Sequence, residues 1–203
     1  SEVLRRIFMQ QPDEIIVVAN GAENLELRDV ALRYGAIYSS LPHPGKRQAI
    51  VAGATLARND YLVIVDSDTL WDDYALHELM KPFKNPAVGG VTTHQEIIDP
   101  DRNTVTRIAA WMEATRAKFS MPAMSALGTV GCLPGRTIAI RKHVLMDNED
   151  EFLRGSFLGY HLRQSVDRAI TNYVLKAGYQ SVYQRTARVY TDAPTTWRKF
   201  IRQ

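Results

Sequence analysis

Two carboxylates stand directly after the clearest strand pattern in the sequence. Residues 61–65 read Tyr-Leu-Val-Ile-Val, and Asp66 and Asp68 follow with one serine between them. Ligands of open α/β sheets bind beyond the carboxyl ends of the strands, so these side chains are placed where a ligand would lie. Mg²⁺ and Mn²⁺ prefer oxygen ligands, of which the protein often supplies only one or two. The pair predicts metal-assisted binding of a nucleotide diphosphate; the alternative is a structural N-cap and turn residue.

Basic residues at the start of a predicted helix suit the same ligand. Lys46 and Arg47 follow Gly45, ahead of a helix rich in small residues. A helix N-terminus with adjacent cations favours a phosphate group. The alternative is that both side chains are only solvated.

A third carboxylate, Asp167, lies in the first turn of a predicted amphipathic helix. The apolar positions of that helix follow a helical period: Val166, Ile170, Tyr173, Val174 and Ala177. Asp167 could act as a general base that takes a proton from an attacking hydroxyl. It could also only stabilise the positive end of the helix. Spacing alone leaves both interpretations open.

These residues lie among alternating strands and helices. Short apolar runs predict strands at residues 14–18, 36–38, 61–65, 88–93, 137–140 and 181–190. Helical spacing predicts helices at residues 2–10, 25–34, 49–56, 76–83, 105–120, 166–177 and 195–203. The acidic run 147–151 is interpreted as a solvated loop. The alternation predicts one α/β domain over residues 1–203, with a mostly parallel central sheet flanked by helices.

Composition limits the classes of protein that remain. Hydrophobic residues make up 45% and charged residues 23% of 203 residues, which are values of a globular domain. The formal net charge is +3, and no basic segment predicts nucleic-acid binding. The one cysteine, Cys132, excludes an internal disulfide; it is interpreted as a small buried residue, with a nucleophile as the alternative. No apolar run predicts a signal peptide or a spanning helix, so we expect a soluble chain.

Seven segments together resemble the family 2 glycosyltransferases with the GT-A fold, most of all the hyaluronan, chitin and cellulose synthase branch. The segments cover nearly the whole chain in order: residues 12–21, 45–49, 65–69 (Val-Asp-Ser-Asp-Thr), 88–92, 131–141 (beginning Gly-Cys-Leu-Pro-Gly), 167–179 and 191–203. Their order and spacing carry the resemblance more than any single segment does.

The resemblance implies a role for each matching residue. On the donor side, Asp66 would contact the nucleoside, Asp68 would hold Mg²⁺ or Mn²⁺ on the diphosphate, and Lys46 would lie near the uridine or phosphates. Residues Gly131, Cys132, Leu133, Pro134 and Gly135 would line the acceptor pocket, with Arg168 beside them. Asp167 would be the general base, and Gln203 the first residue of a Gln-x-x-Arg-Trp motif. The implied reaction moves a sugar from a UDP-sugar to a glycan hydroxyl with inversion at the anomeric carbon.

The sequence also departs from the family pattern. Asn20 stands where the family usually has an acid that reads uracil, although its amide can still bond to a base edge. The acid that usually precedes the base is absent, with Ser165 and Val166 in that stretch. The usual opening strand and the Arg and Trp of the last motif are missing. We therefore expect a fragment truncated at both ends, from a membrane-embedded parent at the cytoplasmic face, and not processive by itself.

Two other functions fit parts of the sequence. Val65-Asp66-Ser67-Asp68-Thr69 also resembles the signature of haloacid dehalogenase-type phosphatases, where the first Asp is a nucleophile. That signature usually has Thr or Val where Leu70 stands. A non-catalytic nucleotide-binding module with the GT-A fold is the second alternative, suggested by Asn20 and by the chain end.

Overall fold

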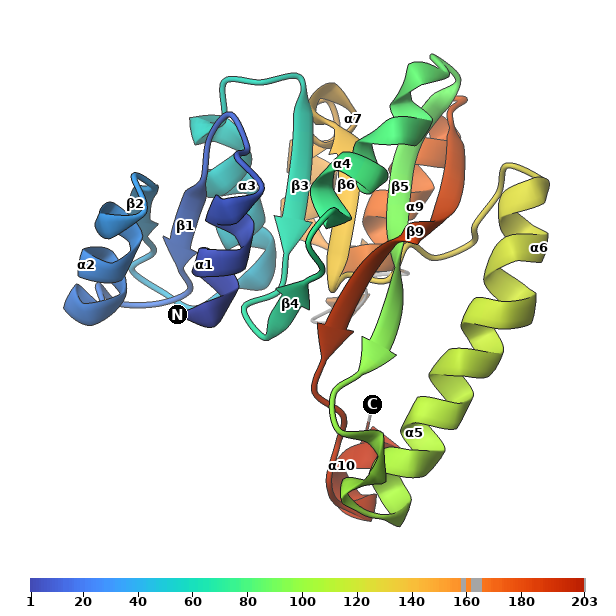
Figure 1. The fold of residues 1–203 in the computed structure, drawn as a ribbon. Coiled ribbons are helices and arrows are strands. Elements are labelled where there is room, and N and C mark those ends of the chain that lie inside the picture. The colour runs from blue at the N-terminus through green and yellow to red at the C-terminus, as the bar shows by residue number, and fades with distance from the viewer. Residues whose placement is uncertain (158–159, 162–165, 203) are drawn as a thin grey trace.

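The computed structural model describes residues 1–157, 160–161 and 166–202. Its N-terminal part alternates helices with a small parallel sheet, seen in blue in Figure 1. The elements are α1 (Glu2–Met9), β1 (Ile16–Ala19), α2 (Leu25–Arg33), β2 (Ile37–Ser40) and α3 (Lys46–Leu56). Strands β1 and β2 pair in parallel, and α3 packs against β1. Asn24 caps α2 by accepting a hydrogen bond from the Leu27 amide at 2.9 Å.

A five-stranded sheet forms the centre of the molecule (Figure 1). Its strands, in spatial order, are β3 (Tyr61–Val65), β6 (Thr137–Arg141), β5 (Val88–Ile97), β9 (Gln180–Thr191) and β4 (Thr69–Trp71). Only β5 and β9 pair in parallel; the other three neighbouring pairs are antiparallel. The α/β class is confirmed, but the expectation of a mostly parallel sheet is wrong for these pairs. Four of the five β6 residues are buried, and such an apolar run does not reveal strand direction.

The remaining helices and turns follow along the chain. They are α4 (Ala75–Met80) with the 3₁₀ turn η1 (Lys81–Lys84), the 3₁₀ turn η2 (Pro100–Arg102), α5 (Thr104–Thr115), the π-helical turn η3 (Arg116–Ser120), α6 (Met121–Ala126), α7 (Lys142–Met146), α8 (Glu149–Arg154), α9 (Val166–Lys176) and α10 (Trp197–Arg202). The short strands β7 (Ser156–Phe157) and β8 (Tyr160–His161) pair antiparallel. The predicted helix over 105–120 continues through η3 into α6, as one long rod in Figure 1.

The acidic run 147–151 is not the loop that we expected. Glu149, Asp150 and Glu151 form the first turn of α8. Acidic side chains are favoured at that end because they face the positive end of the helix dipole. Phe152, which follows, is fully buried and anchors the helix. The acidic residues of this run therefore belong to the beginning of a helix rather than to a loop.

The largest hydrophobic cluster fixes α9 against the sheet. Its fully buried members include Leu133, Ile138, Ile140, Ile170 and Val174. The apolar positions of α9 face this cluster, as their helical spacing predicted. The helix is closed by Gly178 at φ +79°, a left-handed conformation that favours glycine. This packing determines where the first turn of α9, with Asp167, is held.

None of the helices in the described residues has the length and apolar character needed to cross a membrane.

Candidate functional site

The donor side of the site comprises Asn20, Lys46, Asp66 and Asp68. Lys46 begins α3, and its Nζ donates to Asp66 Oδ1 at 2.9 Å. Both side chains are partly exposed, at 47% and 32%. The structure thus brings together two residues that lie 20 positions apart in the sequence. Both were predicted from their places at a helix start and a strand end.

Asn20 follows β1 and joins the donor side through the backbone. Its Oδ1 accepts a hydrogen bond from the Gly45 amide at 2.5 Å. Gly45 is the N-cap residue of α3 and carries no side chain to cap it. The Asn20 side chain therefore satisfies an amide at the start of this helix and ties the two loops together.

Asp68 lies exposed in the turn between β3 and β4. Its carboxylate accepts no hydrogen bond and makes no ion pair with any described residue. No group of three or more His, Cys, Asp or Glu side chains gathers around a metal position in the described part of the chain. Such a sparse oxygen set fits Mg²⁺ or Mn²⁺ held jointly with phosphates and water, the usual arrangement for a nucleotide-bound cation.

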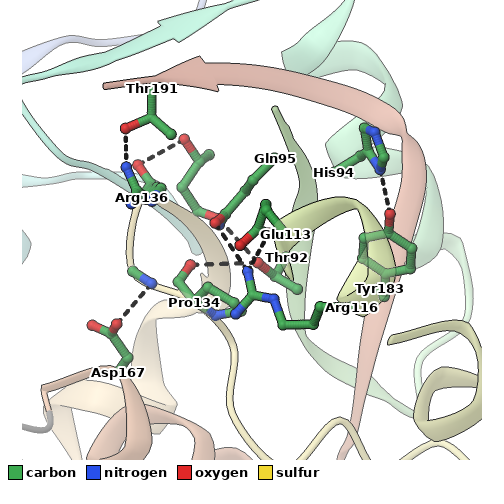
Figure 2. Close-up of polar contacts among 12 residues, drawn as sticks. Thr92, His94, Gln95, Glu113, Arg116, Pro134, Arg136, Asp167, Tyr183 and Thr191 are labelled. Atoms are coloured by element: carbon green, nitrogen blue, oxygen red, sulfur yellow. Dashed lines mark hydrogen bonds and ion pairs between the residues drawn. The ribbon is translucent and has the colours of Figure 1, made fainter. Parts of the chain in front are cut away.

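The base side comprises the loop 131–135 and Asp167. The Asp167 Oδ2 atom accepts a hydrogen bond from the Gly135 amide at 2.8 Å, drawn in Figure 2 beside Pro134. A Cβ atom at position 135 would overlap with the Asp167 carboxylate, so only glycine allows this approach. The second carboxylate oxygen has no hydrogen-bond partner among the described residues. One oxygen of Asp167 is thus held while the other stays available.

Thr171 fixes the same loop one turn further along α9. Its hydroxyl donates to the Asp167 carbonyl at 2.7 Å and accepts from the Leu133 amide at 2.9 Å. Leu133 and Pro134 are buried and expose almost no surface. Gly131 is exposed and Cys132 half-buried, and these two present their surface to solvent.

The charges around Cys132 link it to Asp167. Burial raises the pKa of the Cys132 thiol, and the Asp167 carboxylate raises it further. Arg168, exposed on α9, acts in the opposite direction. The thiol is therefore held in its neutral form at neutral pH, which argues against a nucleophilic role.

Two consecutive residues connect the donor side to the base side. Gly135 donates its amide to Asp167, and the next residue, Arg136, accepts the Asp66 amide on its carbonyl at 3.0 Å. The Arg136 side chain also donates to Thr191 (Figure 2). We had not predicted a role for Arg136, because nothing around it in sequence marks it as a link. The sequence shows only that Arg136 is a basic residue directly before a buried strand.

A second polar group missed at the sequence level lies where β5 meets η3. Arg116 donates from Nη2 to Gln95 Oε1 at 3.2 Å and to Glu113 Oε1 at 2.5 Å (Figure 2). Gln95 is only 3% exposed. The predicted strand ended at residue 93, so the buried polar end of β5 was not foreseen. Gln203, predicted to bind the nucleotide-sugar, lies outside the described residues, as does Ser165.

Comparison with known proteins agrees with the predicted resemblance. The model of the family described as "Glycosyltransferase like family 2" matches residues 1–203. A hyaluronan synthase of Streptococcus pyogenes is 29% identical over 214 residues, covering all of this chain and 51% of the relative. The chain therefore spans about half the length of that relative.

Solved structures show the same fold. A mannosyltransferase from Pyrobaculum calidifontis, solved with GDP-Man and Mn²⁺, matches with a TM-score of 0.70 at 18% identity. The match covers 97% of this chain and 53% of the mannosyltransferase. GalNAc-T7, solved with UDP, GalNAc and Mn²⁺, matches with a TM-score of 0.63 at 13% identity, over 94% of this chain and 40% of that one. The chain has the GT-A fold and belongs to family 2 of the glycosyltransferases.

Proposed function

We propose that this chain transfers a sugar from a UDP-sugar to a glycan hydroxyl, with inversion at the anomeric carbon. The observation that carries the proposal is the Gly135–Arg136 link, which joins the carboxylate suited to a base to the carboxylates suited to a metal-bound diphosphate. Family membership supports sugar transfer in general. The structures solved with a nucleotide and Mn²⁺ support a divalent cation.

In this mechanism Asp167 is the general base. Its unpartnered oxygen takes the proton of the acceptor hydroxyl, and the oxygen of that hydroxyl attacks the anomeric carbon. The bond from the anomeric carbon to the diphosphate breaks on the opposite face, and its electron pair leaves with UDP. The Gly135 amide holds the other oxygen of Asp167, so the base keeps its orientation during the proton transfer.

The donor-side residues hold the nucleotide. Lys46 is an exposed cation that can leave Asp66 and approach a phosphate, and Asp66 is then available to the nucleoside. Asn20 can hydrogen-bond the edge of the base. Asp68 would be the protein ligand of Mg²⁺ or Mn²⁺, which when bound would neutralise the diphosphate as it leaves.

We further propose that the chain is the catalytic part of a membrane polysaccharide synthase and acts at the cytoplasmic face. Its support is the match of the whole chain to half of a hyaluronan synthase. The identity of the sugar donor and acceptor depends on pocket shape, so the proposal stops at the class of each.

Titration of UDP by calorimetry tests the donor side. We expect binding with Mn²⁺ that disappears with EDTA and falls at least about thirtyfold in Asp68→Ala, because the cation loses its protein ligand. Asp73→Ala is the matched control, since Asp73 is exposed and makes no ion pair among the described residues. Equal losses in both variants, or binding that ignores EDTA, would contradict the assignment of Asp68.

The same titration separates catalysis from binding alone. Asp167→Asn should keep UDP binding and lose sugar transfer about 10²–10⁴-fold, the contribution typical of a general base. A wild-type chain that binds UDP with Mn²⁺ but transfers no sugar would instead favour a non-catalytic nucleotide-binding module. Release of phosphate from a simple phosphoester would favour the phosphatase alternative, which the family match does not support.

A further inference from the structure

A cavity of about 510 Å³ lies outside the residues assigned so far. It opens between the α5–α6 rod and the distal halves of β5 and β9, and we call it the α5 cavity. Its polar lining residues are His94, Gln95, Glu96, Glu113, Lys118 and Arg185. Its volume falls within the roughly 300–1,000 Å³ that ligand sites usually have.

A β-bulge supplies one wall of the α5 cavity. Thr93 of β5 pairs with Gln184 of β9, but the next residue, His94, pairs with Arg188. Residues 185–187 therefore have no partner on β5. Bulges of this kind re-aim side chains, and here Arg185 becomes exposed at the cavity.

The charges of the α5 cavity leave two cations without carboxylate partners. Glu113 is paired with Arg116 at 2.5 Å. Glu96 is paired with His94 at 3.1 Å and with Arg188 at 3.7 Å. Lys118 and Arg185 have no carboxylate within ion-pair distance in the described part of the chain. The cavity therefore presents a positive surplus to a ligand, and an anionic group would be favoured there.

The polar groups of the cavity wall, and those that contact it from behind, suit hydroxyl groups. Gln95 is buried and its Nε2 has no hydrogen-bond partner among the described residues, which is unusual for a buried donor. Burial raises the pKa of Tyr183 to about 12, so its phenol stays protonated, and its hydroxyl is hydrogen-bonded to His94 Nδ1 at 2.5 Å. The His94 Nε2–H then donates to Glu96. Amide, imidazole and carboxylate groups held in this way can exchange hydrogen bonds with sugar hydroxyls.

The other lining residues argue against a nucleotide. They are small or cyclic aliphatic residues, Ala110, Ala114, Ala117, Pro100 and Pro122, with Ile97. No Phe, Tyr or Trp lies among the lining residues that the structure describes, so a base would have no ring to stack on. Aliphatic walls can instead cover the apolar face of a sugar ring.

The α5 cavity adjoins the base side of the site. Arg116 contacts its lining residues Gln95 and Glu113, and its charge also acts on the Cys132 thiol. Thr92, three residues before Gln95 on β5, donates to the Pro134 carbonyl at 3.4 Å. Figure 2 shows Thr92 bonded to the Pro134 carbonyl, next to the contact between the Gly135 amide and Asp167. A chain-like ligand could therefore extend from the cavity to the loop 131–135.

We propose that the α5 cavity binds an acidic oligosaccharide, whose carboxylates pair with Lys118 and Arg185 while its hydroxyls meet Gln95 and Glu113. This subsite holds the acceptor glycan some sugars away from the hydroxyl that reacts at Asp167. That the bound oligosaccharide serves as the acceptor rests on the proposed function. That it binds in the α5 cavity does not.

Calorimetry with two probes tests this subsite. A hyaluronan tetrasaccharide is the acidic probe, and a neutral tetramer of N-acetylglucosamine is its uncharged counterpart. We expect the acidic probe to bind more tightly, and the Lys118→Gln/Arg185→Gln double variant to weaken it about tenfold, the effect of losing two partly exposed ion pairs. The matched control is Arg33→Gln/Lys84→Gln, which removes the same charge from exposed cations elsewhere. UDP binding with Mn²⁺ should be equal in all three proteins.

Three results would overturn the subsite: no binding of the acidic probe, equal binding of the neutral probe, or equal weakening in the control variant. The UDP titration keeps this test separate from that of the proposed function. If UDP binds with Mn²⁺ and the acidic probe does not, only the subsite is wrong. If the acidic probe binds through Lys118 and Arg185 but UDP does not bind, the subsite stands and the donor assignment is wrong.

Discussion

The donor side presents exposed side chains joined by one ion pair, whereas the base side is held by the backbone. Lys46 and Asp66 are partly exposed, and the exposed Asp68 side chain makes no hydrogen bond or ion pair with the described residues. Asp167, by contrast, is fixed by the Gly135 amide, and its loop is fixed by Thr171. One end of the site can therefore rearrange around a ligand, while the other is already arranged.

This difference matches the chemistry that each side would perform. A diphosphate with its cation brings its own charges and ligands, so donor-side residues need only be able to turn toward it. A general base must meet one hydroxyl in one orientation, and a small displacement costs rate. Because the Arg136 carbonyl accepts the Asp66 amide, the base side positions the backbone of Asp66. The donor side chains themselves are not fixed by this contact.

The largest test of this contrast is Gly135→Ala. A Cβ atom there would overlap with the Asp167 carboxylate and push the base out of place. We expect sugar transfer to fall about a hundredfold or more, the scale of a lost general base, while Mn²⁺-dependent UDP binding changes little. Gly131→Ala is the control in the same loop, since a Cβ at that position would have no atom within 4 Å. Equal transfer by the two variants would mean that the base side is not rigid.

A smaller effect is expected on the exposed side. Lys46→Met removes the cation of the donor side, and we expect UDP to bind about tenfold more weakly, the loss of one charge-assisted contact. The free energy of unfolding should change by less than about 1 kcal/mol, because the Lys46–Asp66 pair is partly exposed and screened. Urea unfolding and UDP titration measure the two quantities, with Lys84→Met as the control. A large loss of stability with intact UDP binding would show that Lys46 is structural.

On both sides, the sequence predicts the features that depend on a local pattern. The strand 61–65, the acidic pair after it and the α9 helix with Asp167 were predicted because each depends on a local pattern of apolar residues. The roles of these residues came from the family resemblance, and they remain predictions.

Other features depend on contacts between distant segments and could not be predicted in this way. The direction of β6 is determined by its insertion between β3 and β5, and its own residues fit either direction. Gln95 and Arg116 meet only because the α5–α6 rod crosses beside β5. Arg136 acts through its carbonyl, which no residue type reveals.

Asn20 offers a finer test of the donor side. Asn20→Ala leaves the Gly45 amide without its acceptor, so the loop before α3 loses its tie to β1. We expect UDP binding to weaken about threefold, since the net value of one exposed hydrogen bond is about 0.5–1.5 kcal/mol. Asn20→Asp keeps an acceptor for Gly45 and should bind UDP at least as well as the wild-type chain. A stronger loss in Asn20→Asp than in Asn20→Ala would mean that the amide nitrogen, rather than the oxygen, matters.

The smallest expected effect reports on the electrostatics of the base side. Burial and the Asp167 carboxylate both raise the pKa of Cys132, so at pH 8 less of it is thiolate than in a free thiol and alkylation by iodoacetamide should be slow. Asp167→Asn removes the second of these causes, lowers the pKa and should speed alkylation a few-fold at the same pH. Arg168→Gln removes an opposing charge and should slow it. The ratio of the rates of the variant and the wild-type chain, measured between pH 7 and 9, reports the change in thiolate fraction. If Asp167→Asn left the rate unchanged, Asp167 would be neutral or too distant to act on the thiol, and its position beside the loop 131–135 would have to be revised.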